Sequence, residues 1–129
     1  MSDYNTLNPQ EKQYVRAHPI NTYYIKTNRD IAFRETEKQF GFNGHNDKSD
    51  AFRHCFWSAL LSRDIGYNDA MRFTTLHEMR PGNPIAEKTM DLHNNKVGAE
   101  IGRYGGTDAR LSTDCMTALN SGRLIHYQV

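Results

Sequence analysis

The sequence predicts an all-α protein, a compact bundle of about five to six helices with a short extended tail at its C-terminal end. Two observations carry this prediction. Apolar residues recur at spacings of three and four in several segments, and Asn, Asp, Pro and Gly stand where those segments begin and end. The 129 residues, 37% of them hydrophobic, suffice for one core, and no repeat or linker divides them. We therefore expect a single domain over residues 1–129.

The first two helices follow from their boundary residues. Asn8 suits an N-cap, and the helix expected over residues 9–17 then has Pro at its first position and Glu at its third. Pro19 interrupts this helix. A second helix is expected over residues 20–40, because apolar residues keep three- and four-residue spacing up to Gly41.

The third and fourth helices are separated by a glycine. Residues 41–46 contain two glycines and two asparagines, which indicates a loop. The third helix is expected over residues 47–65, because Gly66 suits the left-handed position that follows a helix. Asn68 is the expected N-cap of a fourth helix over residues 69–79.

The last third of the chain is predicted from its prolines and glycines. Residues 80–84 form a turn, and its second proline takes the first position of a fifth helix over residues 84–103. A glycine pair ends this helix, and a short sixth helix is expected over residues 113–120. Residues 123–129 alternate weakly between apolar and polar types, so we expect an extended tail with the pattern of a short strand.

The composition disfavours a strongly basic nucleic-acid-binding face. The chain has 16 basic and 15 acidic side chains, a formal net charge of +1 and no run of like charge. The first residues have no signal-peptide pattern, and no apolar stretch reaches the roughly 18 residues that span a bilayer. We expect a soluble protein, cytoplasmic as encoded, with export without a classical signal peptide as the alternative.

The two cysteines do not predict a metal site. Cys55 and Cys115 are 60 residues apart and form no CxxC pair. We interpret them as buried free thiols. A disulfide remains the alternative, because it depends on a proximity that spacing alone does not give.

Polar side chains form a stripe on the third helix. Asp50, Arg53, His54 and Trp57 are three and four residues apart and therefore share a face, whereas Phe52 begins an apolar stripe on another side. Charged groups inside a small bundle cost stability unless they are paired, and for this reason they often mark a functional site. The alternative is an Asp–Arg clamp that only fixes the packing of the helices.

The fifth helix has a polar end that passes into glycines. Asp91, Asn95, Gly98 and Gly102 fall at intervals of four, three and four. Glycine inside a helix costs about 1 kcal/mol relative to alanine, so this pair indicates the close approach of another helix. If the third and fifth helices pack antiparallel, Asp91 and Asn95 come near His54.

Several residues are candidate ligands for a divalent metal ion. His77 and Glu78 end the fourth helix, but Pro81 excludes the HExxH zinc motif. Ligands contributed one by one from different helices would build a looser site, as in other bundles. The predicted ligands of such an ion are His77, His93 and Asp91, with His54 or Glu78 as further candidates. A second alternative is Ca²⁺ at the glycine-rich loop before the third helix.

A metal-free alternative uses a histidine and an aspartate. His54 would act as the general base on a water molecule, with Asp91 or Asp50 orienting its ring, while Arg53 stabilises negative charge. No nucleophile elbow is present, so a covalent nucleophile is not expected. The predicted catalytic residues are His54, Arg53, Asp91, Asp50 and Glu78. The predicted substrate-binding residues are Trp57, Asn95, Asn94 and His45.

These blocks together resemble a family of uncharacterised bacterial domains. The resemblance rests on HNDKSDAFRH at residues 45–54, on Trp57, on the His-Glu pair at residues 77–78 and on MDLHNNKVG at residues 90–98, and it covers roughly residues 8–104. Cys55 departs from the small alanine that is usual after the Arg-His pair. Members of the family look like standalone proteins and like the C-terminal tips of Rhs-type polymorphic toxins, which implies an enzyme, since such tips are commonly hydrolases.

Residues and resemblance together favour a small bacterial toxin-like hydrolase of an ester or phosphoester, such as a lipid or a cell-envelope precursor. The alternatives are a nuclease toxin and a non-catalytic module that binds a ligand or a partner. A toxin would have a cognate immunity protein or a component of the secretion machinery as its protein partner.

Overall fold

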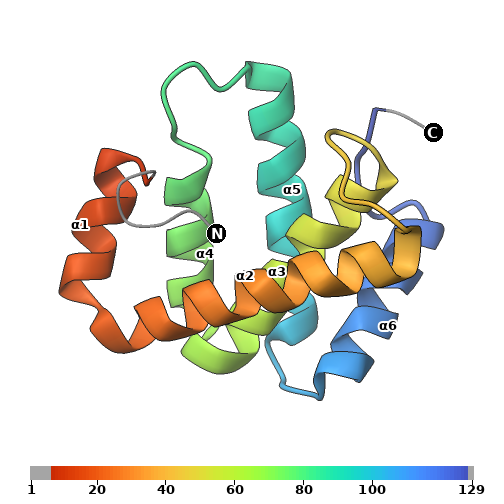
Figure 1. Cartoon of the computed structure of the whole chain (residues 1–129), viewed down its shortest axis with the longest axis horizontal. Helices are drawn as coiled ribbons and strands as arrows, with labels where there is room; N and C mark the ends of the chain where they lie inside the picture. The colour runs from red at the N-terminus through yellow and green to blue at the C-terminus, as the bar shows by residue number, and fades with distance from the viewer. Residues whose placement is uncertain (1–6, 128–129) are drawn as a thin grey trace.

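A computed structural model describes residues 7–127, and the all-α prediction is confirmed within them. There are six helices and no strand in this range (Figure 1). The helices are α1 (Pro9–Ala17), α2 (Pro19–Phe40), α3 (Lys48–Ile65), α4 (Tyr67–His77), α5 (Ile85–Gly102) and α6 (Asp108–Asn120). None of the helices in residues 7–127 has the length and apolar character needed to cross a membrane.

The central helix is α3, which contacts α2, α4, α5 and α6. Its large apolar side chains, among them Phe52, Phe56 and Leu60, are fully buried, and its small residues let neighbouring helices approach closely. The long helix α2 crosses α3, while α1 and α4 lie on one side of it and α6 on the other (Figure 1). The polar stripe of α3 therefore lies between neighbouring helices, which can contribute further partners to it.

A seam of direct backbone contact joins α3 to α5. A Cβ atom built on Gly98 would lie 2.0 Å from the carbonyl oxygen of Cys55, so the glycine allows this approach, as its spacing predicted. Ser58 Oγ and Ser62 Oγ donate hydrogen bonds to the α5 carbonyl oxygens of Asn95 and Ala99, at 2.6 and 2.7 Å. From Ser58 to Ser62 on α3, the accepting residue on α5 moves from Asn95 to Ala99, so residue numbers rise in the same direction along both helices. The helices therefore run parallel, and the antiparallel expectation was wrong, because α4 returns the chain between them.

Two helices begin earlier than the sequence predicted. Helix α4 begins at Tyr67, because Gly66, with φ 93° and ψ 155°, is its N-cap and Asn68 already belongs to the helix. Helix α6 begins at Asp108 rather than near residue 113, because the side chain of Thr107 caps it by accepting a hydrogen bond from the Arg110 amide. The capping box at the start of α1 is confirmed.

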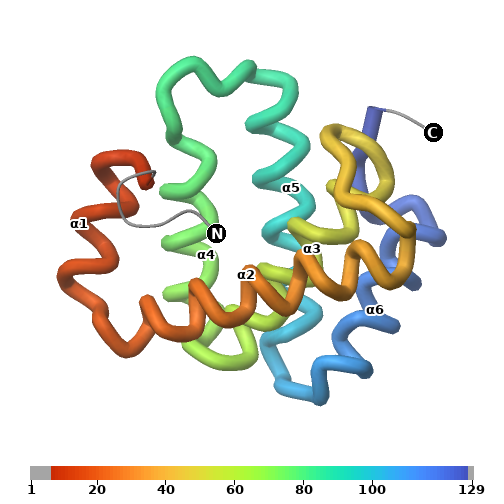
Figure 2. Tube along the Cα trace, in the orientation of Figure 1, coloured from red at the N-terminus to blue at the C-terminus, as the bar shows by residue number. Residues whose placement is uncertain are grey.

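The C-terminal tail is non-helical over residues 123–127, as predicted, but it forms no strand there, while residues 128–129 lie outside the described range. The tail instead crosses the surface beside the loop between α2 and α3 (Figure 2). Asn94, which is fully buried, donates from Nδ2 to the carbonyl of Ile125 at 2.8 Å and accepts from the Ile125 amide at 2.9 Å. The amide of Tyr127 donates to the carbonyl of Asn46 at 2.9 Å. These bonds satisfy the backbone without a neighbouring strand.

Replacing Asn94 with alanine is expected to lower the free energy of unfolding by about 1–3 kcal/mol, because the Ile125 backbone loses both hydrogen bonds. Urea unfolding at equal m-values measures this change. Lys96→Ala, an exposed position two residues further along α5, is the matched control and should stay within about 0.5 kcal/mol of the wild type. Equal stability of the Asn94 and Lys96 variants would show that the tail is not held by these bonds.

The two cysteines are free thiols and both are buried, as the sequence predicted. They lie side by side, with Cys55 Sγ and Cys115 Sγ 3.2 Å apart, and join α3 to α6 within the core. Burial raises the pKa of the Cys115 thiol well above its usual value, so it stays protonated at neutral pH.

Candidate functional site

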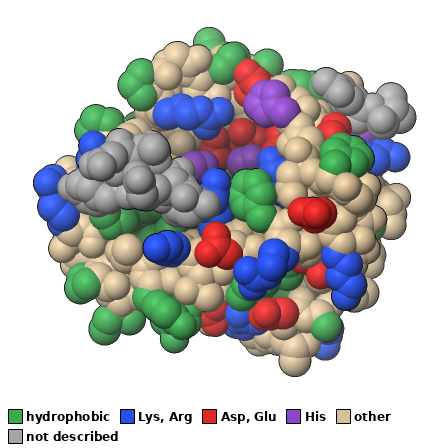
Figure 3. Space-filling view, in the orientation of Figure 1, with side chains coloured by type: hydrophobic (Ala, Val, Ile, Leu, Met, Phe, Trp, Pro, Cys, Tyr) green, Lys and Arg blue, Asp and Glu red, His purple; other side chains and the backbone are tan. Residues whose placement is uncertain are grey.

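The polar stripe of α3 opens into a hollow on the surface, a cavity of about 550 Å³ bounded by α1, α2, α3, α4 and α5. Figure 3 shows acidic and histidine side chains at its bottom and basic side chains around it. The ionisable residues that line the cavity are of three types: the acids Glu11, Asp50 and Asp91, the histidines His45, His54 and His77, and the arginines Arg29, Arg53 and Arg80. A cavity of this size with convergent polar groups is typical of a small-molecule site.

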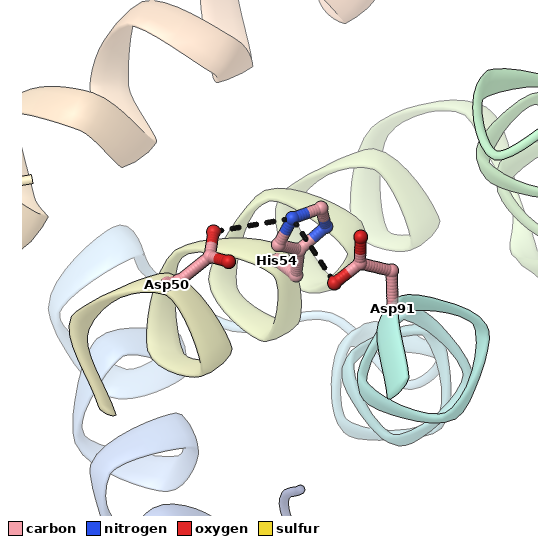
Figure 4. Close-up of side chains that lie close together, drawn as sticks. All are labelled: Asp50, His54 and Asp91. Carbon is pink, nitrogen blue, oxygen red and sulfur yellow. Dashed lines mark ion pairs between the residues drawn. The ribbon is translucent and has the colours of Figure 1, made fainter. Parts of the chain in front are cut away.

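One imidazole ring lies between carboxylates from two helices. His54 Nε2 is 3.3 Å from Asp50 Oδ1 on the same helix and 3.5 Å from Asp91 Oδ1 on α5. Both carboxylates point toward the ring (Figure 4). Asp50 and Asp91 are nearly fully buried, and the side chain of His54 is 15% exposed toward the cavity. The parallel seam between α3 and α5 therefore brings the predicted pair His54 and Asp91 into direct proximity.

The other ring nitrogen of His54 faces the protein interior. His54 Nδ1 lies 3.3 Å from Asn95 Oδ1 and 3.8 Å from Glu78 Oε2, and Asn95 Nδ2 donates to the same glutamate oxygen at 3.2 Å. Glu78 is fully buried, and Arg80 Nη1 lies 3.3 Å from its Oε1. Neither Glu78 nor Asn95 lines the cavity. These two residues orient the ring of His54 and do not face a ligand.

Asp50 is fixed by the first turn of α3. The backbone amide of Asn46 donates to Asp50 Oδ2 at 2.8 Å, and the N-cap residue Asp47 accepts from the Asp50 amide at 3.0 Å. Arg53, one turn further along the helix, donates to the other oxygen of Asp50. Arg53 also donates to Asn43 Oδ1 and to the carbonyl of Gly44, each at 3.1 Å, and so ties the α2–α3 loop to the helix.

The three central groups titrate in different ranges. Burial raises the pKa of Asp50, but the hydrogen bond and charge of His54, the charge of Arg53 and the Asn46 amide outweigh it and bring the pKa to about 2. Burial lowers the pKa of His54, but Asp50, Asp91 and Glu78 outweigh it and raise the pKa to about 9. Burial raises the pKa of Asp91 to about 6, against the charge of His54. At neutral pH, His54 is therefore a cation between ionised carboxylates.

The same groups form a candidate metal centre. One ligand atom each from Asp50, His54 and Asp91 lies within 4.8 Å of the others. Asp91 Oδ1 is buried without a hydrogen-bond partner and has only its ion pair with His54 Nε2 at 3.5 Å, so a metal ion could replace that contact. Two carboxylates and an imidazole are a suitable donor set for a divalent ion. An ion would have to displace the proton of His54.

Two predicted metal ligands lie elsewhere. His77 Nδ1 is 2.7 Å from Glu11 Oε2 and lies at the wall of the cavity, because its neighbour Glu78 is the one of the pair that turns inward. His93 Nε2 contacts the carbonyl of Arg123 at 2.7 Å on the tail side of α5. Of the predicted ligand set His77, His93 and Asp91, the structure therefore brings only Asp91 into the candidate centre.

The predicted substrate-binding residues divide into two groups. Trp57 and His45 line the cavity, Trp57 as a buried wall whose Nε1 donates to the carbonyl of Ile25 and His45 as an exposed rim residue 2.7 Å from Glu87. Asn95 lies behind His54, and Asn94 holds the tail, so neither reaches the cavity. Adjacent helix residues project about 100° apart, and sequence alone does not say which of them faces the cavity.

Two ionisable cavity residues were not predicted as functional, and a third was predicted only for the nuclease alternative. Glu11 was interpreted as the capping residue of α1, Arg29 was not singled out, and Arg80 was expected in a turn and in the basic stripe that a nuclease would need. A signal for Arg29 is present, since Phe33 follows it by four residues and the guanidinium lies 4.4 Å from the ring centroid. The carboxylate of Glu11 caps α1 and also contributes to the cavity wall, because Oε1 accepts a hydrogen bond from the Asn8 amide while Oε2 pairs with His77.

The chain matches the model of a protein family. The model of a family described as "Domain of unknown function (DUF6973)" matches residues 12–123. This range contains Asp50, His54 and Asp91, and it covers all six helices except the start of α1. No solved structure matches the chain.

Proposed function

The chain belongs to this family of domains of unknown function, and from the geometry of its own residues we propose that it is a hydrolase of an ester or phosphoester, with His54 and Asp91 as its acid and base. The observation that carries the proposal is the placement of one imidazole between Asp50 and Asp91 at the bottom of a cavity. Two titratable groups whose surroundings move their pKa values apart are the usual basis of paired acid and base catalysis.

The sequence predicted His54 as the base, whereas the pKa values favour Asp91 as the base and His54 as the acid. Asp91, with a pKa of about 6, is ionised at neutral pH and has an oxygen without a hydrogen-bond donor, so it serves as the base. His54, with a pKa of about 9, carries a proton and serves as the acid. Asp50 stays ionised and keeps His54 charged, which makes Asp50 a positioning residue.

The proposed reaction transfers two protons in one cycle. Asp91 removes a proton from a water molecule as the water oxygen bonds to the phosphorus or carbonyl carbon of the substrate. His54 gives its proton to the leaving oxygen as the ester bond breaks. Asp91 then releases its proton to solvent and His54 takes one up from solvent, which restores both groups for the next cycle. No covalent intermediate with the protein is required, consistent with the missing nucleophile elbow.

A divalent ion at Asp50, His54 and Asp91 is the second candidate, favoured by the buried oxygen of Asp91 that lacks a donor. In that case the ion would polarise the substrate and activate the water, and His54 would be a ligand. The two candidates differ in their response to a chelator. Under acid and base catalysis, EDTA leaves the hydrolysis unchanged, whereas under metal catalysis EDTA abolishes it and added Mg²⁺, Mn²⁺ or Zn²⁺ restores it.

The biological role follows from the resemblance to toxin tips. The proposal includes a toxin-like action on a lipid or envelope precursor of a competing bacterium, with a cognate immunity protein in the producing cell. Expression in the cytoplasm and, separately, with export to the periplasm tests it. Growth arrest only upon export supports an envelope substrate. Degraded nucleic acid after cytoplasmic expression would replace this proposal with the nuclease alternative.

A pH profile tests the roles of the two groups. Purified protein is first assayed on p-nitrophenyl acetate, p-nitrophenyl phosphate and bis(p-nitrophenyl) phosphate to find the active class, and the pH profile is then recorded on an aliphatic ester or phosphoester of that class, whose leaving oxygen has to be protonated. The base has to be deprotonated and the acid protonated, so kcat/KM should rise through pH 6 and fall through pH 9. Asp91→Asn should remove the acidic limb along with about 100-fold or more of the rate. Activity that increases steadily with pH up to 10 would contradict His54 as the acid.

A further inference from the structure

A smaller cavity of about 140 Å³ adjoins the main one. Arg29, Arg53, His54, Trp57 and His77 line both cavities, so the two form one connected site. Their charges differ. The main cavity is lined by three carboxylates, whereas none of the residues that line the smaller cavity is acidic. The smaller cavity is therefore suited to a negatively charged group.

Two guanidinium groups converge on this smaller cavity. Arg29 lies over the ring of Phe33 with its Cζ 4.4 Å from the centroid, and Arg53 lies 4.8 Å from the same centroid. Burial, and after it the charge of Arg53, lower the pKa of Arg29, although Asp30 opposes this shift. Both cations line the same cavity, so an anion bound there would interact favourably with each of them.

The second guanidinium is fixed in place by the protein. Arg53 is held by Asp50 and by the loop atoms Asn43 Oδ1 and Gly44 O, as described above. The guanidinium groups of Arg29 and Arg53 also both lie against the ring of Phe33. Such preorganisation reduces the entropy lost when an oxyanion binds.

We propose that Arg29 and Arg53 form a subsite for the phosphoryl group of the substrate, which rests on the proposed function and narrows the substrate to a phosphoester. A single carboxylate is matched by one guanidinium in a bidentate pair, whereas a phosphoryl group has three oxygens and carries the charge for two. His54 lines the same cavity, so the proposed acid lies beside the phosphoryl group. The rest of the substrate extends into the main cavity, whose wall includes Leu7, Pro9 and Phe73.

Binding of inorganic phosphate tests the subsite without any turnover. Trp57 is the only tryptophan of the chain and lines the smaller cavity, so its fluorescence is a local probe for the titration. The wild type should show a saturable change with phosphate. Arg29→Gln should weaken the binding by about tenfold or more, and Arg29→Lys by less, since a lost charged hydrogen bond costs about 1.5–3 kcal/mol. Arg34→Gln, an exposed arginine on the same helix, is the matched control and should bind phosphate like the wild type.

Two further titrations identify the source of the phosphate group. Glycerol phosphate represents a free phosphomonoester, and micelles of a short-chain phosphatidylglycerol represent a lipid headgroup, with glycerol as the phosphate-free reference. Binding of either phosphate compound, weakened in Arg29→Gln, supports the subsite and says which source fits. Equal binding of phosphate by Arg29→Gln and the wild type, with unfolding curves that show both to be folded, would overturn it.

The outcomes separate this inference from the proposed function. If phosphate binds at Arg29 but no phosphoester or ester is hydrolysed, the anion subsite stands and the hydrolase proposal fails. If p-nitrophenyl acetate is hydrolysed equally by the wild type and Arg29→Gln, and phosphate does not bind, the hydrolase proposal stands and the phosphoryl subsite fails.

Discussion

Replacing His54 with glutamine is expected to lower kcat/KM by about 10³-fold, because general acid catalysis contributes about 10²–10⁴ and the charge of the imidazolium is lost as well. Glutamine keeps a polar side chain of similar reach but cannot give a proton. The loss should appear mainly in kcat, since His54 acts on the leaving group. Steady-state kinetics on an ester or phosphoester of an aliphatic alcohol measure it, because the leaving oxygen of such a substrate has to be protonated.

A second histidine on the neighbouring helix supplies the control. His93 is exposed and contacts the tail, so His93→Gln should retain the wild-type rate. The His54 variant also leaves Asp50, Asp91 and Glu78 without their shared cation, so its unfolding free energy has to be measured alongside. A folded His54→Gln protein with unchanged kcat/KM would eliminate His54 from the mechanism and favour a binding module.

Replacing Gly98 with alanine is expected to lower the free energy of unfolding by about 3 kcal/mol. The new Cβ would lie 2.0 Å from the carbonyl oxygen of Cys55, which is backbone and cannot rotate away. The two helices would have to separate, and overpacking of this kind costs about 1–3 kcal/mol or more. The gain of about 1 kcal/mol in helix propensity from glycine to alanine does not offset the loss of the seam. Urea unfolding measures the change.

The Gly98→Ala variant also tests whether the contact between α3 and α5 positions the residues of the site. Separation of α3 from α5 lengthens the distance between His54 and Asp91, which are 3.5 Å apart, so activity should fall even where the protein stays folded. Glu100→Ala, an exposed position on the same helix, should change neither stability by more than about 0.5 kcal/mol nor activity. A Gly98→Ala protein as stable as the wild type would mean that the helices do not pack through this glycine.

Features with a local cause were predictable from the sequence. The spacing of Asp50, Arg53 and His54 places them on one face of a helix whatever its neighbours are, and the structure joins them by direct contacts. Gly98 and Gly102 predicted a close helix contact, because glycine inside a helix has few other causes. The boundary set by the capping box of α1 was also correct, whereas those set by proline differ by one residue, since α2 begins at Pro19 itself and α5 begins after Pro84.

Features that depend on tertiary packing were not predictable in this way. The direction of α5 relative to α3 depends on the return through α4, and the pattern of neither helix encodes it. Asn94 and Asn95 are adjacent and chemically identical, yet one binds the tail and the other binds His54. The charge of His54 is a further example, because its pKa depends on Glu78 and Asp91, which come from other parts of the chain.

The attachment of the tail also bears on when the site is completed during synthesis. The backbone of Asn46 links two regions, since its amide donates a hydrogen bond to Asp50 while its carbonyl accepts one from the amide of Tyr127. Tyr127 follows Asn46 by about 80 residues. At about 5–20 residues per second, the ribosome needs roughly 4–16 s to add them. A nascent chain therefore lacks this support of the loop before Asp50 until Tyr127 has been added, after the helices that surround the cavity have been made.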